Sequence, residues 1–384
     1  MLLLILILAT VLTSLNYAQK ELGVPDYKCD PSLMAPSKEK PINVNSLRPA
    51  DINIIMGLGD SLSAGNGARA KTIFGVLDQY RGLSFTMGGD KSLEQHITIP
   101  NILRKYNPKL FGQSHGVGDA HNWNVSCFNH AFPGAKARDL PQQAQHLIRI
   151  LKQHPDKVDI KNDWKLLNIF IGGNDLCAYS DNFITHIKNA ILIIKKAIPK
   201  VLVNLIIIFH IDLVRQLDVS DGVCKGIHLF ECTCAIDNRF DNDYMRNISK
   251  SYQLAEKQLK QSGLFESDDF TLVTQPLFSN VDDAPRLANG SVNLDYLAPD
   301  CFHFSQLGHS LVSSWVWKNM LEPVGNKTTK ANLNLPALPL SCPDPSCPFI
   351  RTTENSKNCT KYFSPDKLKS TRRRKLRRRI VRRE

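Results

Sequence analysis

The sequence predicts an α/β protein, a three-layer α/β/α sandwich in which helices cover both faces of a mostly parallel sheet. Short, mostly apolar runs at residues 52–57, 166–171 and 201–209 are typical of strands that are buried on both faces. Between the last two runs, residues 183–198 have apolar side chains at helical spacing. A strand, a helix and a second strand in this order indicate a βαβ unit, so we expect the strands to be parallel.

The individual elements follow from local signals. Gly57 and Gly59 end the first apolar run, and the helix at 183–198 ends before Pro199, where a helix cannot easily continue. Further helical patterns occupy residues 142–152, 244–261 and 307–321. We expect the segment around Cys224, Cys232 and Cys234 to be loop-like, a place where disulfides would stabilise the fold.

Composition shifts divide the chain into five parts. We expect a signal peptide at 1–18, an extended lead-in rich in Pro, Lys and Ser at 19–50, and the compact α/β domain at 51–325. A segment that contains Pro and Cys follows at 326–366, and a basic, disordered tail at 367–384. The sequence contains no internal repeat.

Several features favour export from the cell. Residues 1–13 form an apolar run that is short for a membrane span and is followed by small and polar residues near Ala18, which predicts a cleaved secretory signal. An uncleaved anchor is the alternative, because positive charges are missing before the run. The chain has ten cysteines, which in an exported protein indicates disulfides of undetermined pairing. Five sequons agree with export, at Asn124, Asn247, Asn289, Asn326 and Asn358.

The positive charge is concentrated at one end of the chain. The net charge is +12, but residues 367–384 contain eleven Lys or Arg against one acidic residue, so this tail carries ten of the twelve charges. The remainder is nearly neutral, and we regard nucleic acid as an improbable partner. Such a tail is typical of a solvated segment, of a proteolytic processing site, or of a segment that contacts an anionic membrane. In the last case each basic residue adds about 1 kcal/mol to the free energy of membrane binding.

A serine follows the first predicted strand. Gly59-Asp60-Ser61-Leu62 places Ser61 beyond the carboxyl end of that strand, where open α/β sheets bind ligands. A serine in such a turn can also serve as ordinary turn or cap chemistry. Taken alone, the motif therefore indicates a nucleophile only weakly.

Two later motifs can complete a site around this serine. Asn174, in Gly-Gly-Asn-Asp, follows the second predicted strand, and its amide can donate to a developing oxyanion. Asp300 and His303 supply a carboxylate and an imidazole in one short loop, as a serine nucleophile requires. The alternatives are a Gly-Gly-Asn turn, and a capping Asp beside a packed His303 or His309. No zinc spacing accompanies Cys232-Thr-Cys234, so we expect no metal.

Four blocks in this order resemble the GDSL or SGNH hydrolase family. They are Gly59-Asp-Ser-Leu, Asn129-His-Ala-Phe-Pro-Gly-Ala, Phe170-Ile-Gly-Gly-Asn-Asp-Leu-Cys and Asp300-Cys-Phe-His. The residues of these blocks are most similar to those of the lipase units of animal phospholipase B, and the similarity runs from about residue 52 to 324. The resemblance implies an SGNH, flavodoxin-like fold, with Ser61 as nucleophile, His303 as general base and Asp300 as its partner. It also implies an oxyanion hole from the backbone of Ser61 and Gly134 and the amide of Asn174.

The resemblance implies a secreted serine ester hydrolase that acts on fatty-acyl esters of phospholipids or lysophospholipids without any cofactor. Alternatives on the same fold are a short-chain carboxylesterase and a carbohydrate acetylesterase, because fold does not determine function. A lipid-binding protein without catalysis is a further alternative. Phospholipase B proteins of the membrane-associated type carry repeated lipase units and a C-terminal membrane helix, whereas this sequence shows one unit and a basic tail.

Overall fold

A computed structural model describes residues 21–178, 180–218, 222–334 and 338–363. The expected signal peptide at 1–18 and the basic tail at 367–384 lie outside these residues. Among the described residues, no helix combines the length and the apolar character needed to cross a bilayer.

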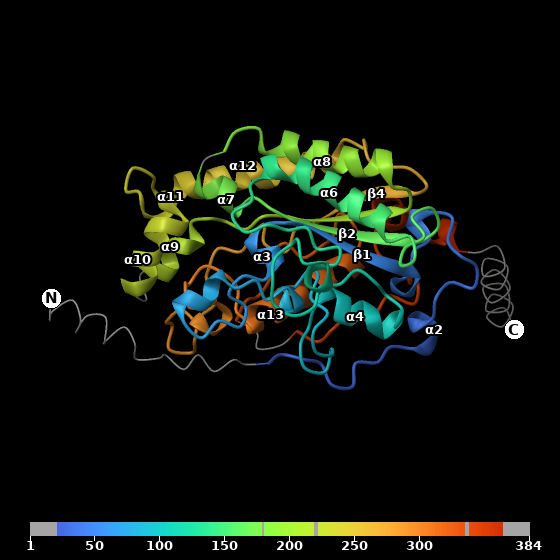
Figure 1. Ribbon diagram of the computed structural model, residues 1–384, viewed down its shortest axis with the longest axis horizontal. Coiled ribbons are helices and arrows are strands. Elements are labelled where there is room, and N and C mark those ends of the chain that lie inside the picture. Colours follow the sequence, from blue (N-terminus) through green and yellow to red (C-terminus); the bar gives the residue numbers. More distant parts are fainter. Residues whose placement is uncertain (1–20, 179, 219–221, 335–337, 364–384) are drawn as a thin grey trace, which may run out of the picture.

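The centre of the molecule is a parallel sheet (Figure 1). Its strands lie in the order β1 (Ile52–Gly59), β2 (Trp164–Phe170), β3 (Val201–Ile206) and β4 (Phe270–Gln275), and each neighbouring pair is parallel. On the outer side of β1, residues 128–132 run parallel to it without forming a regular strand. The Gly57 amide donates to the Phe128 carbonyl, and the Phe132 amide donates to the Gly59 carbonyl. The predicted fold class, α/β with a parallel sheet between helices, is therefore confirmed.

Helices cover both faces of the sheet (Figure 1), and each face has its own apolar core. The helices α6 (Leu140–Gln153), α8 (Phe183–Ala197) and α12 (Asn242–Gln261) cover one face. The helices α4 (Ile99–Tyr106) and α13 (Gln306–Leu321) cover the other. Successive residues of β1 alternate between the two cores, because strand side chains point to opposite faces: Ile54 and Met56 join the first and Ile55 the second.

Shorter helical turns fill the connections between these elements. They are α2 (Pro31–Met34), η1 (Val44–Ser46), η2 (Pro49–Asp51), α3 (Ser61–Ala64), η3 (Ile73–Leu77), η4 (Arg81–Leu83), α5 (Trp123–Ser126), η5 (Ala137–Asp139), α7 (Gly173–Cys177) and η6 (Leu294–Tyr296). Asp241 and Ser305 cap the long helices α12 and α13, respectively, each by accepting a hydrogen bond from a backbone amide of the first turn.

The segment that we expected to be loop-like is helical. It contains α9 (Leu213–Asp218), α10 (Gly222–Glu231) and α11 (Thr233–Ile236). Two disulfides hold this helical segment on the rest of the molecule, Cys177–Cys232 and Cys224–Cys301. The sequence signal was weak because these short helices depend on tertiary anchors more than on a long apolar period. Cys127 and Cys234 are both buried.

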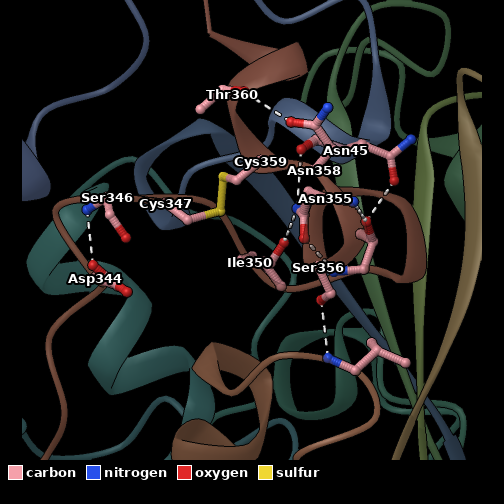
Figure 2. The surroundings of a disulfide bond; sticks show 12 residues. Asn45, Asp344, Ser346, Cys347, Ile350, Asn355, Ser356, Asn358, Cys359 and Thr360 are labelled. Carbon is pink, nitrogen blue, oxygen red and sulfur yellow. Dashed lines mark hydrogen bonds between the residues drawn. A yellow bond between two sulfur atoms is a disulfide. The ribbon is translucent and has the colours of Figure 1, made fainter. Parts of the chain in front are cut away.

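The buried core continues past residue 325, where we expected the compact domain to end. Ile350 is fully buried, and its amide donates to the carbonyl of Leu47 in the lead-in segment. The short helices α14 (Thr353–Lys357) and η7 (Cys359–Tyr362) follow. Figure 2 shows the Cys347–Cys359 disulfide beside Asn355, whose side chain donates to the Asn45 carbonyl at 3.0 Å. The disulfide Cys29–Cys342 joins the same two regions. Within the described residues, both flanking segments therefore pack against the α/β domain.

Candidate active site

The sequence motifs meet at the carboxyl edge of the sheet. In the register between β1 and β2, Gly59 lies opposite Phe170. Ser61 follows the first strand by two residues, and Asn174 follows the second by four. Parallel strands end at the same edge, so the register brings these two segments together. The 128–132 segment ends there too, because its last amide donates to the Gly59 carbonyl at 3.1 Å. Gly134 lies immediately beyond it.

A tight turn presents Ser61 at the start of α3. Gly59 has φ +155°, and a Cβ atom at this position would lie 2.3 Å from the Phe170 carbonyl oxygen, so that only glycine fits. The next residue, Asp60, is buried and caps the turn by accepting a hydrogen bond from the Leu62 amide at 3.0 Å. Burial raises the pKa of Asp60 to about 7. Packing around the strand end thus determines where the serine lies.

Ser61, His303 and Asp300 form a continuous hydrogen-bonded chain. His303 Nε2 lies 2.8 Å from Ser61 Oγ, and His303 Nδ1 lies 2.5 Å from Asp300 Oδ2. Asp300 Oδ1 accepts hydrogen bonds from the backbone amides of Phe302 and His303, both at 3.0 Å. The carboxylate is fully buried, while the serine and the imidazole are 6% and 8% exposed. An imidazole held in this way can accept the serine proton while its other nitrogen donates to the carboxylate.

The electrostatics of this chain favour a strong base. Burial by itself lowers the pKa of His303, but the charge of Asp300 and its hydrogen bond outweigh burial, and the resulting pKa lies above the ordinary value. Glu231 and Asp60 add smaller contributions in the same direction. For Asp300, burial opposes ionisation, yet His303 and the two amide donors lower its pKa. The carboxylate therefore stays ionised and stabilises a protonated imidazole.

Candidate oxyanion donors line the neighbouring loops. The Asn174 side chain donates to the Ala135 carbonyl at 3.0 Å, which leaves the second amide hydrogen for another acceptor. Gly134 is exposed and has φ +74°, a conformation that favours glycine. Asp175 accepts from the Ala137 amide at 2.9 Å and so connects α7 to the turn that follows Gly134. Burial raises the pKa of Asp175 to about 6.

Two residues of the site were missed by sequence reasoning. Gln143 on α6 contacts the backbone of Gly59 with both ends of its amide, each at 2.9 Å. Glu231, at the end of α10, has a carboxylate oxygen within 4.8 Å of the polar groups of Asp300 and His303. Burial, followed by the charge of Asp300, raises the pKa of Glu231 to about 7. Neither residue belongs to a local motif, because each reaches the site through tertiary packing.

Within the described residues, two groups of side chains have the proximity that a metal ion requires. The first contains Cys177, Cys232 and Cys234, but two of these sulfurs are already joined in a disulfide. The second is the trio of Glu231, Asp300 and His303, in which both imidazole nitrogens already take part in hydrogen bonds. Two of the three sulfurs in the first group and both imidazole nitrogens in the second are thus engaged within the protein.

Comparison with known proteins identifies the family of this chain. Residues 55–316 match the family described as GDSL-like lipase/acylhydrolase. The chain is 42% identical over 338 residues to membrane-associated phospholipase B1 of Mus musculus, an alignment that covers 84% of this chain and 22% of the relative. The corresponding protein of Homo sapiens is 40% identical over 337 residues, covering 84% and 23%. The chain therefore spans less than a quarter of the length of these relatives. The resemblance predicted from the four blocks is confirmed.

Proposed function

This chain belongs to the GDSL-like lipase/acylhydrolase family, and from that premise we propose that it hydrolyses fatty-acyl esters of phospholipids and lysophospholipids. The family is one of carboxylic ester hydrolases, and the named relatives are phospholipases. The observation that carries the proposal is the hydrogen-bonded chain from Ser61 through His303 to the buried Asp300. We assign these three residues as the catalytic triad.

In the first half-reaction, Ser61 Oγ attacks the ester carbonyl while His303 Nε2 accepts the hydroxyl proton. Asp300 keeps the imidazole in the productive tautomer and stabilises its positive charge. The negative charge that develops on the carbonyl oxygen is stabilised by the backbone amides of Ser61 and Gly134 and by the amide of Asn174. Collapse of the tetrahedral intermediate breaks the ester bond. His303 then gives its proton to the departing alcohol, and the acyl group remains on Ser61.

In the second half-reaction, water attacks the acyl-enzyme. His303 Nε2 accepts a proton from the water, and the same three donors stabilise the second oxyanion. The acyl–oxygen bond to Ser61 breaks, and His303 returns its proton to the serine oxygen. The fatty acid leaves and the free enzyme is restored. In both half-reactions His303 carries the proton between the nucleophile and the leaving group.

We further propose that the chain is exported and contacts membranes through its basic tail. Four disulfides among the described residues support folding in an oxidising compartment, where such bonds persist. Residues 367–384 supply the charge for attraction to anionic lipid. Deletion of these residues is expected to weaken binding to anionic vesicles and to leave hydrolysis of a soluble monomeric ester unchanged. Equal vesicle binding by both forms would remove the tail from this proposal.

The function is tested by incubating the purified protein with a mixed phospholipid extract in detergent and identifying the products by mass spectrometry. We expect free fatty acids together with lysophospholipids or their deacylated head groups, and no release by Ser61→Ala. An enzyme that turns over only acetyl or butyryl esters would be a short-chain esterase, and release by Ser61→Ala would remove the serine from the mechanism. A matched control is Ser63→Ala, because Ser63 lies on the same turn but is fully buried.

A further inference from the structure

A cavity borders the proposed catalytic residues. It has a volume of about 350 Å³ and opens between η3 and α10, within the size range of small-ligand pockets. Its walls are formed by Ile73, Phe74, Val76, Leu77, Gly226, Ile227 and Glu231. Glu231 is the only ionisable side chain among them, and it lies within 4.8 Å of the polar groups of Asp300 and His303. The cavity is therefore apolar and adjacent to the general base.

The rim of this cavity exposes large apolar side chains. Phe74 is 82% exposed and Leu77 is 81% exposed, although both line the cavity. Among the described residues, only Ile42 is a more exposed large apolar side chain, at 86%, and the next, Leu254, is 54% exposed. Single exposed apolar residues are ordinary. Two of them on one helical turn, at the mouth of an apolar cavity, are typical of an interaction surface.

Both walls of the cavity are fixed to the triad loop. Val76 of η3 is buried and packs with Ala298, whose amide donates to the His303 carbonyl at 2.8 Å. On the other wall, the Cys224–Cys301 disulfide joins α10 to the residue that follows Asp300. The exposed side chains are thus held in a constant position relative to the catalytic residues. A surface that is rigidly connected to the site can deliver a substrate to it.

We propose that Ile73, Phe74 and Leu77 form a docking surface that enters the outer layer of a phospholipid bilayer. The choice of lipid rests on the proposed function, because the substrate acyl chains lie in such a layer. An apolar rim lets an acyl chain pass from the bilayer into the cavity without contact with water, which would be costly. Exposed cations stand beside both walls, Lys71 before η3 and Lys225 on α10, where they favour phosphate head groups.

The docking surface is tested by vesicle sedimentation in a Ser61→Ala background, so that the lipid stays intact. The probe variant is Phe74→Ser with Leu77→Ser, and the vesicles are either pure phosphatidylcholine or phosphatidylcholine with phosphatidylglycerol. Removal of two large apolar side chains from the lipid contact should weaken binding at least about tenfold on both vesicle types. The matched control is Ile42→Ser with Leu254→Ser, which removes two comparably large exposed side chains elsewhere and should bind as the parent does.

The outcomes separate this proposal from the proposed function. If the probe variant binds both vesicle types as tightly as the parent, or if the parent binds neither, the docking surface is wrong even when detergent-dispersed phospholipid is hydrolysed. If the probe variant loses binding but an intact Ser61 releases no fatty acid from detergent-dispersed lipid, the docking surface stands and the proposed function fails. Circular dichroism and thermal midpoints equal to those of the parent are required of both variants. A probe variant that is unfolded is replaced by Phe74→Gln with Leu77→Gln.

Discussion

Gln143 holds the backbone of Gly59 from both sides. Its Oε1 accepts a hydrogen bond from the Gly59 amide and its Nε2 donates to the Gly59 carbonyl, both at 2.9 Å. Gly59 is the last residue of β1 and stands two residues before Ser61. The same carbonyl also accepts from the Phe132 amide. Gln143 therefore joins the nucleophile turn to the helix layer, while the Gly59 carbonyl also joins this turn to the loop that leads to Gly134.

Gln143→Leu should lower both stability and turnover, because it leaves a buried amide of Gly59 without its partner. The expected loss in the free energy of unfolding is about 1–3 kcal/mol. We also expect kcat to fall, since the serine turn loses one of its anchors. Gln145→Leu is the matched control, because Gln145 lies on the exposed side of the same helix. A Gln143→Leu enzyme with the parent's melting midpoint and kcat would contradict this role.

His303→Ala should lose activity by about 10³-fold or more, whereas His309→Ala should keep most of it. His309 lies inside α13, is fully buried and accepts a hydrogen bond from the Phe85 amide at 3.3 Å. Burial also holds its pKa well below the ordinary value. Its loss should therefore lower stability more than turnover. The measurement is kcat per mole of folded protein, with the folded fraction of each variant taken from its thermal unfolding curve, and the reverse order of the two variants would reassign the general base.

Asn174→Ala should lower kcat by about 10² to 10³-fold with little change in KM, because an oxyanion donor acts mainly in the transition state. Asn174→Asp should be at least as damaging, since an ionised carboxylate repels the developing charge. Loss of the hydrogen bond to the Ala135 carbonyl by itself would act differently. It would lower the thermal midpoint while the folded enzyme turned over at the normal rate, and that result would remove Asn174 from the oxyanion hole.

Glu231→Gln should move the acidic limb of the kcat/KM profile to lower pH. The base is active only while His303 is neutral, so activity falls as the pH drops through the pKa of His303. The negative charges of Asp300, Glu231 and Asp60 all raise that pKa. Removing the Glu231 charge therefore lowers it, and the enzyme stays active in more acidic buffer. Glu39→Gln, at an exposed position, is the control. If the midpoint of the acidic limb stays at the same pH in Glu231→Gln, or moves to higher pH, the electrostatic coupling between Glu231 and His303 is contradicted.

The fold class could be predicted because its main elements carry strong local signals. The strands β1, β2 and β3 are mostly apolar runs, α8 ends before Pro199, and α13 has a helical pattern over residues 307–321. The strand β4 was not predicted, since Phe-Thr-Leu-Val-Thr-Gln mixes apolar and polar residues although five of its six positions are buried. Its burial is a consequence of the layers above and below, which no local pattern records.

In the candidate site, too, residues in local motifs could be predicted, whereas residues placed by tertiary packing could not. Ser61, Asn174, Asp300 and His303 stand in short motifs at strand or domain ends, so sequence reasoning could name them, and the structure brings Ser61, His303 and Asp300 into hydrogen-bond contact. Their catalytic roles remain predictions. Glu231 could not be predicted from the sequence, because its position near the site depends on α10, a helix that a disulfide anchors to the triad loop. The pairing of ten cysteines could not be deduced from spacing.

The central claim is that Ser61 is a nucleophile activated by His303, and covalent labelling tests it most directly. The native protein is incubated with a fluorophosphonate, digested, and examined by tandem mass spectrometry, alongside Ser61→Ala and His303→Ala. We predict one phosphonylated residue, Ser61, no adduct in Ser61→Ala, and labelling at least about 10³-fold slower in His303→Ala. A labelled residue other than Ser61, or labelling of Ser61 at an undiminished rate in His303→Ala, would contradict the mechanism.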